Sequence, residues 1–63
     1  MTYDITTEIA AFVGMLLLNE DDPQEWTIED AEYNMQCWAE EEIETPEGMT
    51  AELLLAEWNS QIA

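Results

Sequence analysis

The segment Ile9–Leu18, IAAFVGMLLL, decides the fold, because it is the one uncharged and mostly apolar run in an otherwise densely acidic chain. Arranged as a helix at about 100° per residue, it places one apolar set on a single face. The opposite face is apolar too. A helix that is apolar all round must be covered all round, so we expect this segment to be a central helix with two other segments packed on it. The first face carries Ile5, Ile9, Phe12, Val13 and Leu16, and the second carries Ala11, Gly14, Met15 and Leu18.

Two alternatives remain open for this segment. The β-branched Ile9 and Val13 suit a strand, in which case residues 9–18 would be a strand in a small α+β domain. The second apolar face could also be the interface of a dimer, although we expect a monomer. A bilayer-spanning helix needs about 20 apolar residues, and this run is shorter, so no membrane association is predicted.

Composition limits the domain further. Sixty-three residues predict a single domain, 1–63, whose stability is marginal at this size. Cys37 is the sole cysteine and there is no histidine, so neither an internal disulfide nor a zinc site can support the fold. No cofactor is expected. A lone free cysteine suits a reducing cytoplasm, and the opening residues lack the basic region of a secretory signal.

Two further helices are predicted by a short repeat with an offset of 23 residues. Residues 23–29 and 46–52 share the pattern Pro-x-x-apolar-Thr-x-Glu. In each copy the threonine can cap a helix and the following glutamate lies in the positive first turn. We therefore predict helices over residues 28–42 and 51–62, after a first helix over residues 5–18. The expected fold is all-α, a compact three-helix domain with Trp38 and Trp58 buried.

Charge is the dominant feature of the chain. It contains sixteen Asp and Glu residues but no Lys, Arg or His. Repulsion of this size destabilises a compact state, and no internal salt bridge can offset it. The reason for the charge should therefore lie in a partner with a basic surface.

The candidate partner-binding residues lie where the acids are densest. The outer face of the second helix and the loop after it come first, together with an aromatic side chain that could anchor a partner. The acidic turn before that helix comes next. The first set is Glu29, Asp30, Glu32, Tyr33, Glu40, Glu41 and Glu44, and the second is Asp21, Asp22 and Glu25.

Other functions are disfavoured by the same residues. The acidic turn lacks the Asp-x-Asp-x-Asp-Gly spacing of a calcium loop, so no metal site is predicted. An enzyme is not expected, because there is no histidine base, no cation to bind an oxyanion, and little volume for a pocket. Cys37 has no neighbouring cation to lower its pKa. Direct nucleic-acid binding is opposed because no side chain can neutralise a phosphate.

In size, extreme acidity, expected compactness and lack of a catalytic set, the chain resembles the small phage-encoded DNA-mimic inhibitors, the anti-CRISPR and anti-restriction proteins. The resemblance implies a basic nucleic-acid-binding partner in the cytoplasm of the bacterial host, such as a CRISPR effector or a restriction enzyme. Within that group we favour an anti-CRISPR protein that acts on a type I surveillance complex by competing for its DNA or PAM site. The alternative is an acidic adaptor that binds a basic protein without competing with DNA.

Overall fold

The computed structural model describes residues 2–63, and within that range it contains three helices and no strand. They are α1, Ile5–Leu17, α2, Ile28–Glu40, and α3, Ala51–Ile62. The all-α three-helix prediction is confirmed, and the alternative of a strand over residues 9–18 is wrong. The radius of gyration is 11.3 Å, so the chain is compact.

Each helix begins at a side-chain cap that the sequence supplies. Asp4 caps α1 by accepting from the backbone N–H of Thr6 at 3.1 Å. Thr27 caps α2 in a full capping box with Asp30, and Thr50 caps α3 by accepting from the N–H of Leu53 at 3.2 Å. Such caps each stabilise a helix by about 1 kcal/mol. The two threonine caps predicted from the repeat are therefore confirmed.

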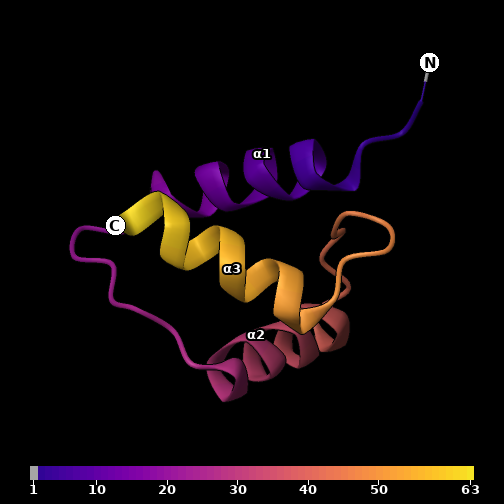
Figure 1. Cartoon of the computed structure of the whole chain (residues 1–63). Coiled ribbons are helices and arrows are strands. Elements are labelled where there is room, and N and C mark those ends of the chain that lie inside the picture. The colour runs from indigo at the N-terminus through magenta and orange to yellow at the C-terminus, as the bar shows by residue number, and fades with distance from the viewer. Residues whose placement is uncertain (1) are drawn as a thin grey trace.

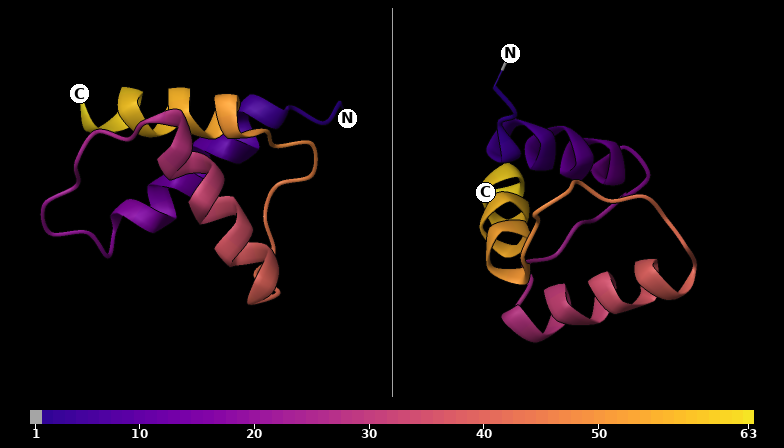
Figure 2. Two further views of the ribbon diagram at one scale, coloured as in Figure 1. Left: turned by 90° about the horizontal axis from the view of Figure 1, so that it is seen from below. Right: turned by 90° about the vertical axis from the view of Figure 1, so that its right-hand side faces the viewer.

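The helix in the middle of the domain is α3, not α1. Helix α3 packs against both α1 and α2, whereas α1 and α2 lie on opposite sides of it (Figures 1 and 2). In Figure 1, α1 and α3 both run from right to left and α2 runs from left to right, but the view from below in Figure 2 shows that α2 crosses the other two helices steeply. The expectation that the apolar run Ile9–Leu18 is the central helix is thus wrong. The apolar side chains of α3 pack against two helices, whereas those of α1 pack mainly against one.

The core is built from one buried stripe of each helix. Helix α1 contributes Ile9 and Val13, α2 contributes Ala31 and Trp38, and α3 contributes Leu54 and Trp58, joined by Met49. The predicted burial of both tryptophans is confirmed. Where α1 and α2 diverge, the rings of Phe12 and Trp38 meet edge to face with centroids 5.1 Å apart. This aromatic pair fills the space that no helix–helix contact covers.

The second face of α1 is left open. Met15 is 66% exposed and Leu18 is 79% exposed, so the expectation that this helix is covered on all sides is wrong. The reason is the placement of α3, which covers the side of α1 that carries Ile9 and Val13 and leaves Met15 exposed. On α2, the apolar side chains of Ile28 and Ala39 are exposed, because they lie in the first and last turns.

Helix α2 ends at Glu40, two residues earlier than predicted, with Glu41 as its C-cap. Beyond it, Glu42 adopts a left-handed conformation with φ of 57°. The N–H of Ile43 donates to the carbonyl of Trp38 at 2.8 Å, and the N–H of Glu42 donates to that of Ala39. These bonds form a Schellman motif, in which the left-handed position is usually glycine.

The segment that joins α1 to α2 is attached to α3 by tryptophan and asparagine side chains. The indole N–H of Trp58 donates to the carbonyl of Gln24 at 2.8 Å. Asn59 accepts from the N–H of Trp26 at 2.9 Å and donates to its carbonyl at 3.0 Å. The rings of Trp26 and Trp58 stack, with centroids 3.9 Å apart. We call these contacts the Trp26 clamp, and they fix the acidic segment before α2.

Candidate partner-binding surface

The carboxylates cover the surface of the described chain. Every Asp and Glu side chain is exposed except that of Glu57, which is half-buried and accepts a hydrogen bond from Gln61 at 2.9 Å. Because the sequence has no basic side chain, no acid can form an ion pair with another side chain. The electrostatic field of the domain therefore extends outward unneutralised.

The N-terminal part of α2 carries three acids, Glu29 and Asp30 in its first turn and Glu32 in the next. Asp30 accepts from the N–H of Thr27 at 2.9 Å and from its hydroxyl at 3.1 Å. The carboxylate of Asp30 is therefore already engaged in the capping box. Glu29 and Glu32 are three residues apart, so their side chains lie about 5–6 Å apart on one face and project into solvent.

Tyr33 follows on the same face and is 67% exposed. The adjacent Cys37 thiol, together with the charge of Glu40, raises the pKa of the Tyr33 hydroxyl above its ordinary value. A tyrosine hydroxyl is protonated at neutral pH even without this shift, so it can donate a hydrogen bond. Cys37 itself is half-buried beside it.

A second acidic group lies at the C-terminal end of α2. It begins about 16 Å along the helix from Glu29, at a rise of about 1.5 Å per residue. The candidate residues on α2 thus form two acidic groups separated by Tyr33 and Cys37, rather than one unbroken patch. We call the second group the C-terminal acidic group, and it comprises Glu40, Glu41, Glu42 and Glu44, all exposed.

The C-terminal acidic group opposes the electrostatics of its own helix. The C-terminus of a helix is the negative end of its dipole, where anions are unfavourable and cations are favourable. The last turn of α2 has no basic residue. Sequence reasoning included three of these acids but missed Glu42, which was assigned to the helix and whose left-handed conformation has no signal in the sequence.

Asp21, Asp22 and Glu25 lie on the connection between α1 and α2 and are all exposed. The Trp26 clamp holds the end of this connection against α3. These acids therefore flank the N-terminal end of α2 on a tethered segment, whereas Glu44 lies beyond its other end.

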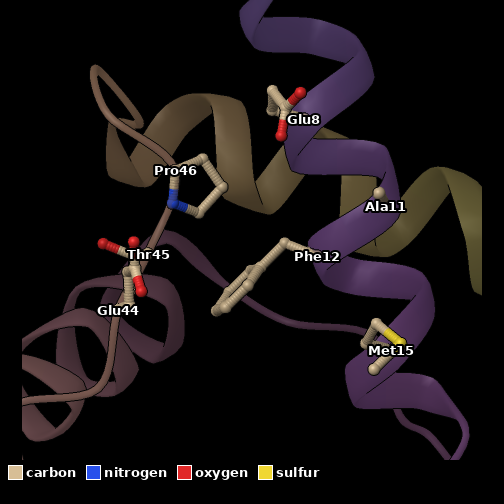
Figure 3. Close-up of a pocket in the computed structure, with 7 residues that line it drawn as sticks. All are labelled: Glu8, Ala11, Phe12, Met15, Glu44, Thr45 and Pro46. Carbon is tan, nitrogen blue, oxygen red and sulfur yellow. The ribbon is translucent and has the colours of Figure 1, made fainter.

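A shallow groove of about 330 Å³ separates α1 from the loop before α3 (Figure 3). The Phe12 ring points from α1 toward that loop and forms the centre of the groove. The sequence does not indicate this groove, because its two walls are 29 or more residues apart in the chain. The groove is lined by Glu8, Ala11, Phe12 and Met15 on one side, and by Glu44, Thr45 and Pro46 on the other.

In the part of the chain that the structure describes, no group of three or more His, Cys, Asp or Glu side chains is arranged to hold a metal ion. None of the helices within residues 2–63 is long and apolar enough to cross a membrane.

Comparison of the chain with protein-family models, with curated protein sequences and with solved structures returns no match.

Proposed function

We propose that this protein is a DNA mimic that inhibits a bacterial host-defence protein by occupying its basic nucleic-acid-binding groove. The target we favour is a type I CRISPR surveillance complex, at its DNA or PAM site. The observation that carries the proposal is the C-terminal acidic group of α2, where carboxylates are concentrated at a position that lowers the stability of the domain itself.

The destabilisation that the C-terminal acidic group causes is large relative to the total stability of the domain. A non-glycine residue in a left-handed conformation costs roughly 1–2 kcal/mol. Each anion at a helix C-terminus costs about 0.3–1 kcal/mol at low salt. A chain of this length has a total stability of roughly 3–9 kcal/mol, at about 0.05–0.15 kcal/mol per residue. The presence of acids that lower the stability so strongly is readily explained if a basic partner neutralises their charge on binding.

The geometry suits imitation of a polyanion. The domain measures 35 × 26 × 20 Å and carries sixteen carboxylates. Along its longest axis that is one charge per about 2.2 Å, against one per about 1.7 Å in duplex DNA. The carboxylates are exposed, as phosphates are, and can displace the counterions of a basic groove and steer association.

The test is a binding titration with the partner captured from bacterial lysate at low salt. The pair Glu40→Lys and Glu41→Lys should weaken binding by several kcal/mol in sum, because charges that become buried and paired at an interface cost 2–5 kcal/mol each when lost. The matched control is Glu20→Lys with Glu52→Lys, which changes the net charge equally outside the candidate surface. Equal loss in both pairs would show that only net charge matters and would contradict a defined binding face.

The acidic adaptor remains a second candidate, and one observation favours it. Met15, Leu18 and Tyr33 expose large apolar surfaces that imitation of phosphates does not require. An adaptor would use them to bind a basic protein outside its nucleic-acid groove. A complex that binds this protein and duplex DNA at the same time would support the adaptor.

A further inference from the structure

The groove between α1 and the loop before α3 combines an apolar floor with an acidic rim. Ala11, Phe12 and Met15 form the floor from successive turns of α1, and Pro46 faces them from the loop. Glu8 and Glu44 lie on opposite walls, one from each segment (Figure 3). Both carboxylates are exposed, and Met15 is 66% exposed.

This combination matches a particular kind of side chain. A long basic side chain lays its aliphatic stem on apolar surface and keeps its charged head near water. The volume of about 330 Å³ lies at the lower end of the range for small-molecule sites. Small-molecule sites bury most of their ligand, whereas this groove is shallow, so it suits one extended side chain of a partner better than a complete organic ligand.

Arginine fits this surface better than lysine. Its planar guanidinium is weakly hydrated, stacks on aromatic rings and pairs with carboxylates through a fork of donors. Phe12 supplies the ring, while Glu8 and Glu44 supply the carboxylates. A second copy of the chain is a poor occupant, because its sixteen acids would meet the same charge.

We propose that this groove is a docking site for an arginine of a basic partner protein, one that projects from a segment with apolar neighbours. The inference rests on the proposed function for the basic character of the partner. It adds the groove as a second contact region beside the C-terminal acidic group of α2, with which the groove shares Glu44. The guanidinium lies between Glu8 and Glu44, and the arginine stem and a neighbouring apolar residue cover Phe12 and Met15.

The experiment uses two short synthetic peptides of equal positive charge as probes, one with leucine between its arginines and one with glycine. Binding to the full chain is followed by calorimetry and by the backbone amide signals of Phe12 and Thr45. We expect the arginine–leucine peptide to bind more tightly and to shift both signals. Met15→Gln should weaken that peptide about tenfold, equivalent to about 1.4 kcal/mol, through partial loss of apolar burial.

Leu18→Gln is the matched control, because Leu18 is equally apolar and even more exposed but lies outside the groove. It should leave binding unchanged. For the rim, Glu44→Gln should weaken both peptides and Glu20→Gln should weaken them less. Equal effects of Met15→Gln and Leu18→Gln, or unmoved groove signals with the peptide bound, would overturn the inference.

The groove proposal and the proposed function can fail independently of each other. If the groove signals stay unmoved while duplex DNA still displaces the protein from its partner, the groove inference alone fails. If the peptide binds the groove as expected but duplex DNA does not compete for the partner, DNA mimicry fails and the docking site stands.

Discussion

Replacing Asn59 tests the Trp26 clamp, which the structure identifies as the main polar tie between the acidic segment and α3. In wild type, the Asn59 side chain makes both a donated and an accepted bond with the backbone of Trp26, at 3.0 and 2.9 Å. Asn59→Ala removes both bonds and leaves two partly buried backbone groups without partners. At about 1 kcal/mol net for each lost bond, with a further desolvation penalty, we expect a loss of about 2–3 kcal/mol.

A loss of that size is readily measured. For a domain of this length, 1 kcal/mol shifts the melting temperature by about 4–8 °C, so Asn59→Ala should lower it by roughly 10–20 °C in calorimetry or circular dichroism. Asn34→Ala is the control, because its side chain makes a single local bond to the carbonyl of Asp30 at 2.8 Å on the exposed surface. That variant should change stability by less than about 0.5 kcal/mol.

Asn59→Asp sharpens the test because it keeps the shape of the side chain. The carboxylate can still accept from the N–H of Trp26, but its second oxygen now faces the carbonyl that received a hydrogen bond. Protonation restores a donor, so the folded state raises the pKa of this carboxyl. The destabilisation should be full at neutral pH, shrink as pH falls through the raised folded pKa, and be absent below the unfolded pKa of about 4. Equal melting of Asn59→Ala, Asn34→Ala and wild type would refute the clamp.

The remaining predictions concern charge, backbone and pH, each followed by thermal melting. The melting temperature of wild type should rise between about 0.01 M and 0.5 M salt as repulsion is screened, and a flat curve would mean that bound cations already compensate it. Gly14→Ala should stabilise α1 by about 1 kcal/mol, because its Cβ would meet only Gln61 at 3.8 Å, and no gain would indicate a hidden clash. Glu42→Gly should stabilise by about 1 kcal/mol by relieving the left-handed conformation, and a loss would contradict the strain. The hydroxyl of Thr7, and after it backbone N–H groups, lower the pKa of Asp4. The Asp4 carboxylate therefore stabilises the folded state above its ordinary pKa, and this stabilisation is lost as pH falls through the pKa of Asp4 in the folded state. Asp4→Ala should therefore lower the melting temperature at pH 7, the difference from wild type should shrink as pH falls through the folded pKa of Asp4, and a difference that does not change with pH would contradict this.

The local structure was largely predictable from the sequence. Thr27 and Thr50 cap helices where the repeat indicated, because capping depends on a few neighbouring residues. The helix bounds agree within two residues, and Trp38 and Trp58 are buried as expected.

The arrangement of the helices was not predictable in the same way. The periodicity of Ile9–Leu18 indicates which residues can be buried but not which helix lies in the middle, since that depends on pairwise packing. No sequence pattern marks Asn59, yet it bonds to Trp26, thirty-three residues earlier. The groove that pairs Glu8 with Glu44 likewise arises only when α1 and the later loop meet in space.

The acids themselves were found from sequence, but their relation to the backbone was not. Asp30 is engaged in a capping box, whereas Glu42 takes a left-handed conformation that favours glycine. Acids that stabilise a helix and acids that destabilise it look alike in the sequence. The structure separates the two, and the second kind supports a role outside the fold.

The most direct test of the central claim is a competition measurement on the captured partner at fixed salt. Increasing amounts of duplex DNA are added to the complex, and the species present are resolved by sedimentation. If the protein is a DNA mimic, DNA should displace it completely, its apparent affinity should fall in proportion to the DNA added, and the variant with Glu40→Lys and Glu41→Lys should be displaced at lower DNA concentrations. A stable ternary complex of partner, protein and duplex would contradict it.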